Sequence, residues 1–417
     1  MRRVRLALGS VLLACALALG LGACLDTSLT ATELTADTHP VEEASLATPD
    51  GSATYDFSLD LLRACVSEKP DESVLVSPLS TLSALALAEN GADGETLSQM
   101  EQVTGMDVDE LTDMLQAQAQ LGEKDQRPLS LANSVWLRDT DGLSVKDTFL
   151  DDCGGRLGAQ VFSAPFDGST VNDVNAWVGD KTHGMIPSMI SEIPDQAQLL
   201  LVNALAFEGA WEEPFDSESI EPDVFTCKDG TEQDVEMMRS TESTFLENDL
   251  ATGFTKPYED YGYAFVGLLP KEGVSVEELV GSLDGAMLRE LLTPVYGTRA
   301  EIGLPRFTAT YESDLSGALA GLGMADAFDP GRADFSRAGS SEAGPLYIGE
   351  VLHKTYVDVN EEGTHAAAAT VVALESGSSA PGGPTETREV ILDRPFVYLI
   401  VDQLTGMPVF AGTFMGE

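Results

Sequence analysis

The sequence predicts a single large domain of the α+β class, with mixed helices and strands, over residues 53–417. Segments with apolar residues at helical spacing occur among runs of β-branched and aromatic residues that are typical of strands. The length alone would suggest about two or three domains. Proline and glycine, however, punctuate the chain evenly, and no shift in composition marks a second domain.

Helices are expected where capping signals and apolar spacing agree. Ser77 can accept a backbone hydrogen bond at a helix N-terminus, and Pro78 at the first helical position loses no donor that the helix needs. Leucine and alanine cover nearly the whole surface of this helix, which predicts that it is buried, and Gly91 ends it. The expected helices cover residues 53–64, 78–91, 95–103 and 171–183.

Strands are expected in the apolar and β-branched runs along the rest of the domain. The C-terminal region is mostly strand, and a turn at Leu404-Thr405-Gly406 joins its last two runs into a hairpin. The expected strands cover residues 131–137, 198–207, 263–269, 346–348, 355–359, 396–401 and 409–414.

Residues 1–23 have the pattern of a secretion signal. Three arginines precede an apolar run over residues 6–21, which is too short to span a bilayer comfortably. The run ends in Leu21-Gly22-Ala23-Cys24, which resembles a bacterial lipobox. This resemblance implies a lipid on Cys24 and export to the outer face of a bacterial cell membrane, from which the protein can also be shed. The alternative is an ordinary secretion signal that happens to contain a cysteine.

Residues 24–52 are expected to form a flexible tether between this anchor and the domain. They contain several acidic residues, no lysine or arginine, no aromatic residue and no helical periodicity. A segment of this composition buries too little surface to offset the entropy lost on ordering.

The charge of the chain excludes one class of function. With 69 acidic and 23 basic residues, the formal net charge is −46, whereas a nucleic-acid-binding protein needs basic surface to displace counterions. Nucleic acid is therefore not an expected partner. The same charge favours solubility and weak self-association, so we expect a monomer.

No pattern of metal-binding or catalytic residues stands out. The four histidines are scattered, the carboxylates follow no EF-hand pattern, and no GxSxG elbow occurs with a suitable histidine and acid. We therefore expect no metal, no cofactor and no enzyme activity. Cys65, Cys153 and Cys227 are odd in number, which argues against a full disulfide framework and leaves their pairing open.

Groups of residues in order along the chain resemble signature motifs of the serpin family. They begin with Ser77-Pro78-Leu79-Ser80 and end in the closing hairpin, so they cover nearly the whole domain. One such motif would be weak, but the ordered set is specific. The groups are residues 77–80, 201–204 with 207–215, 322–328 with 333–336, 353–354 with 359–364, and 394–396 with 405–406.

The resemblance implies one domain with three β-sheets, about nine helices and an exposed reactive loop over residues 361–388. It also implies suicide inhibition of serine proteases. The protease serine attacks the loop and forms an acyl-enzyme, and the N-terminal half of the loop then inserts as a strand into the main sheet. The implied partner is a target serine protease in a covalent one-to-one complex. A non-inhibitory serpin that acts as a binding or chaperone-like module is the alternative.

The beginning of the loop, its hinge, has a composition that favours inhibition. Alternate residues of an inserted strand face the core, and from Thr364 onward the inward residues are small and uncharged. His365 would face solvent, where many inhibitory relatives have glutamate. Taken alone, the segment would suggest a short helix followed by a surface loop. The hinge comprises Glu361, Gly363, Thr364, Ala366, Ala367, Ala368, Ala369 and Thr370.

Family spacing from Glu361 places the scissile bond between Gly377 and Ser378, with the bonds from Ala373 onward as alternatives. Small residues there suit an elastase-like or subtilisin-like protease better than a trypsin-like one.

The resemblance also implies that two groups of residues control the opening of the sheet. Trp211 matches the breach, the top of the sheet where insertion begins, and the other group matches a polar cluster beneath the sheet, the shutter. By residue type alone, Trp211 would fit core packing about equally well. For His353, a hydrogen-bonded core histidine and a shutter residue amount to the same expectation. The shutter comprises Ser77, Ser80, Asn203 and His353.

Overall fold

The computed structural model describes most of the predicted domain and a short segment before it. The predicted signal peptide and Cys24 lie outside the described residues, and so do hinge residues 366–370 and the predicted bond Gly377-Ser378. Within the described part of the chain, no helix is both long enough and apolar enough to cross a membrane. The structure describes residues 29–35, 38, 52–125, 129–140, 142–259, 262–342, 344–364 and 386–416.

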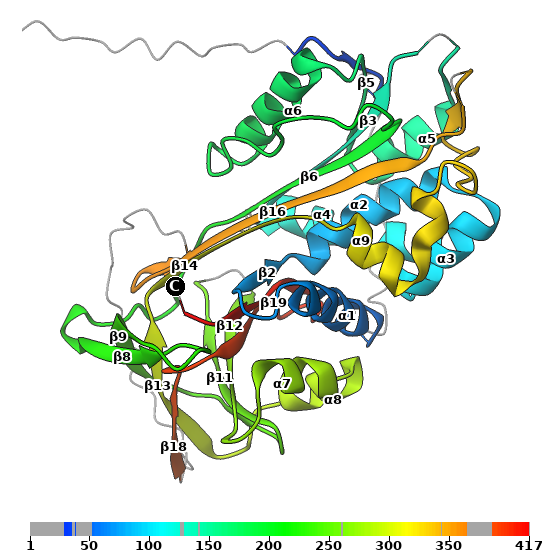
Figure 1. The fold of residues 1–417 in the computed structure, drawn as a ribbon. Helices are drawn as coiled ribbons and strands as arrows, with labels where there is room; N and C mark the ends of the chain where they lie inside the picture. The colour runs from blue at the N-terminus through cyan, green and yellow to red at the C-terminus, as the bar shows by residue number, and fades with distance from the viewer. Residues whose placement is uncertain are drawn as a thin grey trace, which may run out of the picture.

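An eight-stranded main sheet runs through the molecule (Figure 1). Its strand order is β1-β5-β3-β6-β16-β17-β7, and β14 pairs with β16 beside this path. The two runs predicted at residues 346–348 and 355–359 belong to one long strand, β16. The bounds are β1 Thr32–Glu33, β3 Leu129–Arg138, β5 Gln160–Ala164, β6 Leu199–Phe207, β7 Gly209–Ala210, β14 Phe307–Asp314, β16 Ile348–Val359 and β17 Gly363–Thr364.

Two further large sheets and one small sheet complete the β structure of the described residues. The six-stranded sheet has the order β10-β11-β12-β19-β20-β2, the four-stranded sheet the order β18-β13-β9-β8, and β15 pairs with β4. The predicted C-terminal hairpin is β19 and β20. The bounds are β2 Val74–Val76, β4 Ser144–Val145, β8 Ile220–Thr226, β9 Glu232–Glu242, β10 Phe245–Glu247, β11 Ala251–Pro257, β12 Tyr263–Pro270, β13 Thr298–Pro305, β15 Gly339–Ser340, β18 Glu386–Ile391, β19 Phe396–Asp402 and β20 Pro408–Phe414.

Helices cover both faces of the main sheet (Figure 1). On one face, Val174 and Trp177 of α6 pack with Leu200 of β6. On the other face, Leu79 of α2 shares a core with Leu201, because successive side chains of a strand point to opposite faces. The bounds are α1 Ser52–Glu68, α2 Pro78–Gly91, α3 Gly94–Thr104, α4 Val108–Asp125, α5 Asp147–Leu150, α6 Gly168–Lys181, α7 Val276–Ser282, α8 Gly285–Leu291 and α9 Ser316–Leu319.

The prediction for α2 is confirmed in detail. Ser77 is its N-cap, the Ser77 hydroxyl accepts a hydrogen bond from the backbone N–H of Ser80, Pro78 opens the helix, and every residue as far as Gly91 is buried. A helix without polar surface gains its stability from packing rather than from contact with water. In this buried position α2 packs against β6 of the main sheet.

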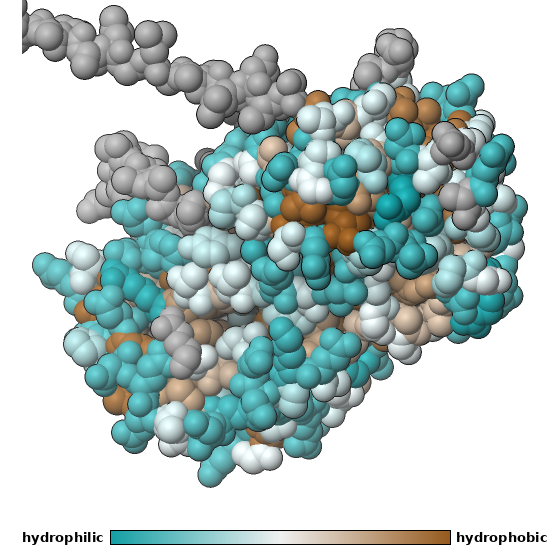
Figure 2. All heavy atoms as spheres, turned by 45° about the horizontal axis from the view of Figure 1, so that its top comes forward, coloured by the Kyte–Doolittle hydropathy of each residue, from teal (hydrophilic) through white to brown (hydrophobic). Residues whose placement is uncertain are grey.

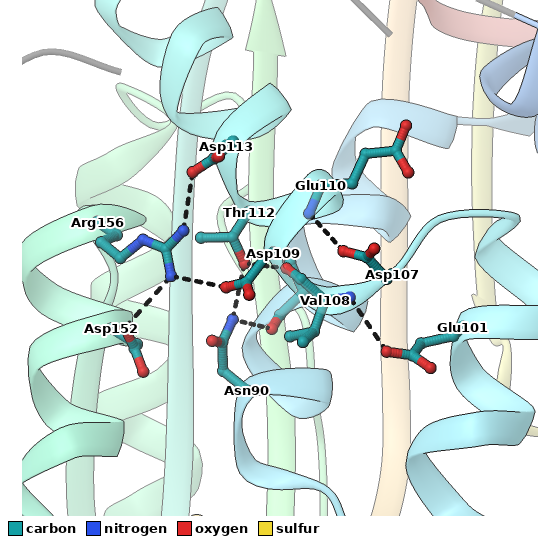
Figure 3. Close-up of polar contacts among 11 residues, drawn as sticks. Asn90, Glu101, Asp107, Val108, Asp109, Glu110, Thr112, Asp113, Asp152 and Arg156 are labelled. Carbon is teal, nitrogen blue, oxygen red and sulfur yellow. Dashed lines mark hydrogen bonds and ion pairs between the residues drawn. The ribbon is translucent and has the colours of Figure 1, made fainter. Parts of the chain in front are cut away.

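The acidic residues around the beginning of α4 form ion pairs and hydrogen bonds with nearby residues of the chain (Figure 3). Arg156 forms ion pairs with Asp109, Asp113 and Asp152, the shortest of them 2.8 Å long, to Asp113. Asp107 accepts a hydrogen bond from the backbone N–H of Glu110 at 2.9 Å. Carboxylates at a helix N-terminus are stabilised by its free N–H groups. Part of the negative charge is therefore used locally in helix capping.

The prediction of a flexible tether is wrong for residues 29–35. Strand β1 pairs antiparallel with β5, and the backbone N–H groups of Thr30 and Ala31 donate to the Asp173 carboxylate of α6 at 2.8 to 3.0 Å. Thr35 is buried. By itself this polar segment can bury little surface. It is ordered by two features of other elements, the edge of β5 and the Asp173 acceptor, which together bind it.

The three cysteines of the domain are free. Cys65 and Cys153 are buried, Cys227 is partly buried, and burial raises the pKa of the Cys65 thiol to about 11. Among the described residues, no three histidine, cysteine or acidic side chains are grouped so that they could hold a metal ion. Figure 2 shows a face on which hydrophilic residues predominate, with hydrophobic residues exposed in several places among them.

Candidate functional site

The candidate site lies between β6 and β16, which in the described part of the chain pair directly at one end, while at the other end β17 lies between β16 and β7. At the lower end, residues 199–202 of β6 pair with residues 348–352 of β16. Above this point both strands continue, but in the described chain their mutual pairing stops. At the upper end, β17 lies between β16 and β7, with Thr364 opposite Val359 on one side and Gly209 on the other.

The first hinge residues are therefore already in the sheet. Thr364 is fully buried, and a hydrogen bond of 2.6 Å joins its hydroxyl to that of Tyr258. A Cβ atom on Gly363 would lie 2.1 Å from the Gly209 carbonyl oxygen, so only glycine fits at this crossing. The structure shows that Thr364 points into the core, which is the orientation assigned to it from the alternation of a strand.

A tight turn before β17 fixes the approach of the loop. The Asn360 side-chain oxygen accepts hydrogen bonds from the backbone N–H groups of Glu362 and Gly363, at 2.9 and 3.2 Å. Trp211 donates its indole N–H to the Asn360 carbonyl at 2.8 Å. Glu361 forms an ion pair of 2.6 Å with Arg306, just before β14. Sequence reasoning did not single out Asn360 or Arg306, although Asn360 lies within one of the motifs.

Aromatic side chains and one buried ion pair support the top of the sheet. Trp211 stacks on Tyr258, with ring centroids 4.5 Å apart and planes 16° from parallel. The Lys256 ammonium lies 4.2 Å from the centre of the Phe215 ring and 2.8 Å from the Glu242 carboxylate. A buried charge needs such a partner, since it has lost its hydration. Lys256 and Glu242 gave no signal in the sequence, because nothing in their spacing links them to Trp211.

Lower along the same position, the polar residues carried over as the shutter are in contact. The backbone N–H of Ser77 donates to the Nε2 atom of His353 at 3.1 Å, and the Ser77 hydroxyl donates to the Val409 carbonyl at 2.7 Å. Ser80 donates to the Asn203 side chain, and Asn203 donates to Asn133. Burial lowers the pKa of His353 to about 4, so its ring is neutral and can accept this hydrogen bond.

Comparison with known proteins agrees with this geometry. The family described as "Serpin (serine protease inhibitor)" matches residues 52–416. The chain belongs to the serpin family. It is 30% identical to the leukocyte elastase inhibitor of Equus caballus over 380 residues, which is 87% of this chain and 98% of that protein. It is 31% identical to Serpin B9 of Homo sapiens over 379 residues, again 87% of this chain and 98% of that protein.

Among solved structures, the serpin fold of this chain is similar to that of tengpin, a thermophilic serpin, in its native state. The TM-score is 0.84 at 36% sequence identity, and the match covers 93% of this chain and 100% of tengpin. The family and the serpin fold expected from the motifs are therefore confirmed.

The expectation of no enzyme activity needs correction as a description of this serpin. It rested on a missing GxSxG elbow, and a missing motif does not define a function. The family match replaces it with a positive statement, because serpins are protease inhibitors, not catalytic enzymes, and bind target proteases.

The structure brings the predicted site residues of this serpin into two groups along one strand position. Trp211, Glu361, Gly363 and Thr364 lie at its top, and the shutter residues lie lower. The predicted loop bounds, 361–388, are too wide, since residues 363–364 belong to β17 and residues 386–388 to β18. At both ends of the loop the backbone pairs with neighbouring strands. The small residues of the loop sequence gave no sign of this pairing.

Proposed function

We propose that this serpin is a suicide inhibitor of serine proteases, exported and held at the outer face of a bacterial cell membrane by a lipid on Cys24. The protease serine oxygen forms an ester with a loop carbonyl, the peptide bond breaks, and the new amino terminus of the C-terminal part, which stays in the fold through β18, β19 and β20, takes a proton. Insertion of the loop then carries the acylated protease away before water reaches the ester. One covalent complex forms per inhibitor.

The stretch between β6 and β16 where no described strand lies between them carries this proposal. Extending the two registers of β17 would set residue 366 opposite Val357 and residue 370 between His353 and Asn203. The sequence supplies alanine at residue 366 and threonine at residue 370, which are small enough for a crowded sheet. The inserted segment would then span the whole distance from the breach to the shutter.

The proposed targets are elastase-like or subtilisin-like proteases. The predicted bond lies in a run of small residues around Gly377-Ser378, without a basic residue for a trypsin-like pocket. The net charge of −46 would speed the association of this inhibitor with a cationic protease.

The proposed lipid would hold the domain close to the bilayer. Cys24 lies five residues before Leu29, the first described residue, so an extended connection would reach about 18 Å. The β1 side of the main sheet would then lie nearest the membrane. Labelling by a fatty-acid precursor should occur in the native chain and disappear in Cys24→Ser; equal labelling of both would exclude this anchor.

Adduct formation tests the inhibitory function. The soluble domain is incubated with elastase-like, subtilisin-like, chymotrypsin-like and trypsin-like proteases, and with each protease after its active serine has been blocked. We expect an SDS-stable complex with the first two active enzymes only, and a C-terminal fragment, separated on the denaturing gel, that begins at Ser378. Cleavage without a complex for every protease would favour the non-inhibitory alternative.

A further inference from the structure

We propose that Tyr258 is a positioning residue for loop insertion, because its hydroxyl holds Thr364 in the sheet before any protease is bound. Insertion would then extend a strand that has already begun instead of starting a new one. The inference deepens the proposed inhibitory function and rests on it for its biological meaning. We call the contacts of Thr364 with Tyr258, Val359 and Gly209 the seat of the hinge.

The Tyr258 ring has a fixed place in the core. It stacks on Trp211 and meets the edge of Phe207, with a centroid distance of 4.9 Å to Phe207. Its backbone forms a bridge with Trp211, and its N–H donates to the Tyr263 carbonyl at 3.0 Å. Only 2% of the residue is exposed. A ring held on several sides aims its hydroxyl in one direction, which here is the Thr364 hydroxyl.

Two glycines leave the room that this contact needs. A Cβ atom on Gly209 would lie 2.9 Å from the Tyr258 ring and 2.9 Å from the Phe207 ring. On the opposite strand, Gly363 crosses the Gly209 backbone too closely for any side chain. The seat therefore requires glycine on both strands, with Thr364 and Tyr258 joined beneath them.

Seating the first residue changes the kinetics of insertion. The first pair of a new strand costs chain entropy before other pairs compensate for it, and this cost is already met where Thr364 is paired. During inhibition, insertion competes with hydrolysis of the acyl-enzyme. If Thr364 is not paired in the sheet beforehand, insertion is slower. Hydrolysis then releases the protease more often, and a larger share of the inhibitor is cleaved without trapping it.

Four variants separate the hydroxyl contact from general packing. Tyr258→Phe keeps the stacked ring and removes its hydroxyl oxygen. Thr364→Val removes the hinge hydroxyl, whereas Thr364→Ser keeps it. The matched control is Tyr398→Phe, since Tyr398 is fully buried and its hydroxyl has no hydrogen-bond partner among the described residues. Each variant, and the Tyr258→Phe/Thr364→Val double variant, is first checked for native unfolding by urea.

The insertion rate is measured after a zinc metalloprotease has cut the loop, because such an enzyme forms no acyl-enzyme. Gain of resistance to heat reports insertion. We expect Tyr258→Phe and Thr364→Val to insert about three- to tenfold more slowly, the range set by one net hydrogen bond. Thr364→Ser and Tyr398→Phe should keep the native rate. The double variant should be no slower than the slower single variant, because both changes break the same bond.

Two outcomes would overturn the inference. Unchanged insertion in Tyr258→Phe would show that the hydroxyl does not position the hinge, and faster insertion would show that it restrains the loop. The ratio of inhibitor consumed to protease trapped should rise in the variants that insert slowly. If insertion slows as expected but the native serpin traps no protease, the proposed function fails while the role of Tyr258 in insertion stands.

Discussion

Replacement of Thr364 by arginine is expected to abolish covalent trapping and to leave the loop a good substrate. Thr364 is fully buried between β7 and β16, with its side chain against Tyr258. A guanidinium there would lack a partner, which costs about 3 kcal/mol or more. That penalty corresponds to roughly hundredfold slower insertion, so the acyl-enzyme is hydrolysed and the protease is released before insertion occurs. Adduct yield on denaturing gels, together with the amount of cleaved inhibitor, measures the effect.

Thr387→Arg is the matched control for this prediction. Thr387 lies at the other end of the loop, in β18, where its side chain is exposed. The same change of charge and size should therefore leave trapping within about twofold of the native serpin. Retained trapping by Thr364→Arg, or an equal loss in both variants, would mean that the seat of Thr364 in the sheet is not needed for inhibition.

Replacement of Glu89 by glutamine is expected to stabilise the fold in alkaline solution. Glu89 is fully buried in α2, where one of its oxygens accepts a hydrogen bond from Thr104 at 3.1 Å and the other has no partner among the described residues. Burial raises the pKa of this carboxyl to about 8, and the nearby charges of Glu101 and Asp107, which are visible in Figure 3, add to the rise. Glu89 is therefore protonated in the fold at neutral pH.

The direction of the pH effect follows from the raised pKa. The folded state binds this proton more tightly than the unfolded state, so stability falls as pH rises from about 4.5 through about 8. The loss is on the order of 4 kcal/mol over that window. Glutamine resembles the protonated acid and carries no such loss. Urea unfolding at pH 5 and pH 8 should therefore show a smaller decline for Glu89→Gln than for the native chain.

Two comparisons isolate Glu89. His353 has a lowered pKa, so its contribution to stability is lost as pH falls from about 6.5 through about 4, but it is present in both proteins and cancels. Glu95→Gln removes an exposed carboxylate from the neighbouring helix α3 and should not change the decline. If Glu89→Gln and the native chain lose the same stability between pH 5 and pH 8, Glu89 is ionised in the fold.

Much of the site could be predicted because local signals and family motifs coincide there. The Ser77 cap and the apolar surface of α2 are properties of one short segment, and both are confirmed. His353 and Asn203 lie within motifs, and the structure places both beneath the opening of the sheet. The inward direction of the Thr364 side chain could be predicted because alternate residues of a strand point to opposite faces of the sheet.

Several of the missed features depend on partners that are distant in sequence. The Asp173 carboxylate accepts hydrogen bonds from Thr30, which is 143 positions away in the sequence, and Tyr258 is hydrogen-bonded to Thr364, which is 106 positions away. No local pattern marks either pair. The acidic segment before the domain looked flexible because its own composition offers no core, yet an edge strand and a carboxylate supplied by other elements order part of it. Lys256 beside Glu242 shows the same limit, since its burial depends on tertiary packing.

A crystal structure of the serpin cleaved in its loop would test the insertion mechanism most directly. The mechanism predicts a new strand between β6 and β16, antiparallel to both, that continues from Thr364. Residue 366 would lie opposite Val357, and residue 370 would lie between His353 and Asn203, with its side chain toward the core. A cleaved loop that stays outside the sheet, or strands β6 and β16 that close directly on each other, would contradict loop insertion and the inhibitory function built on it.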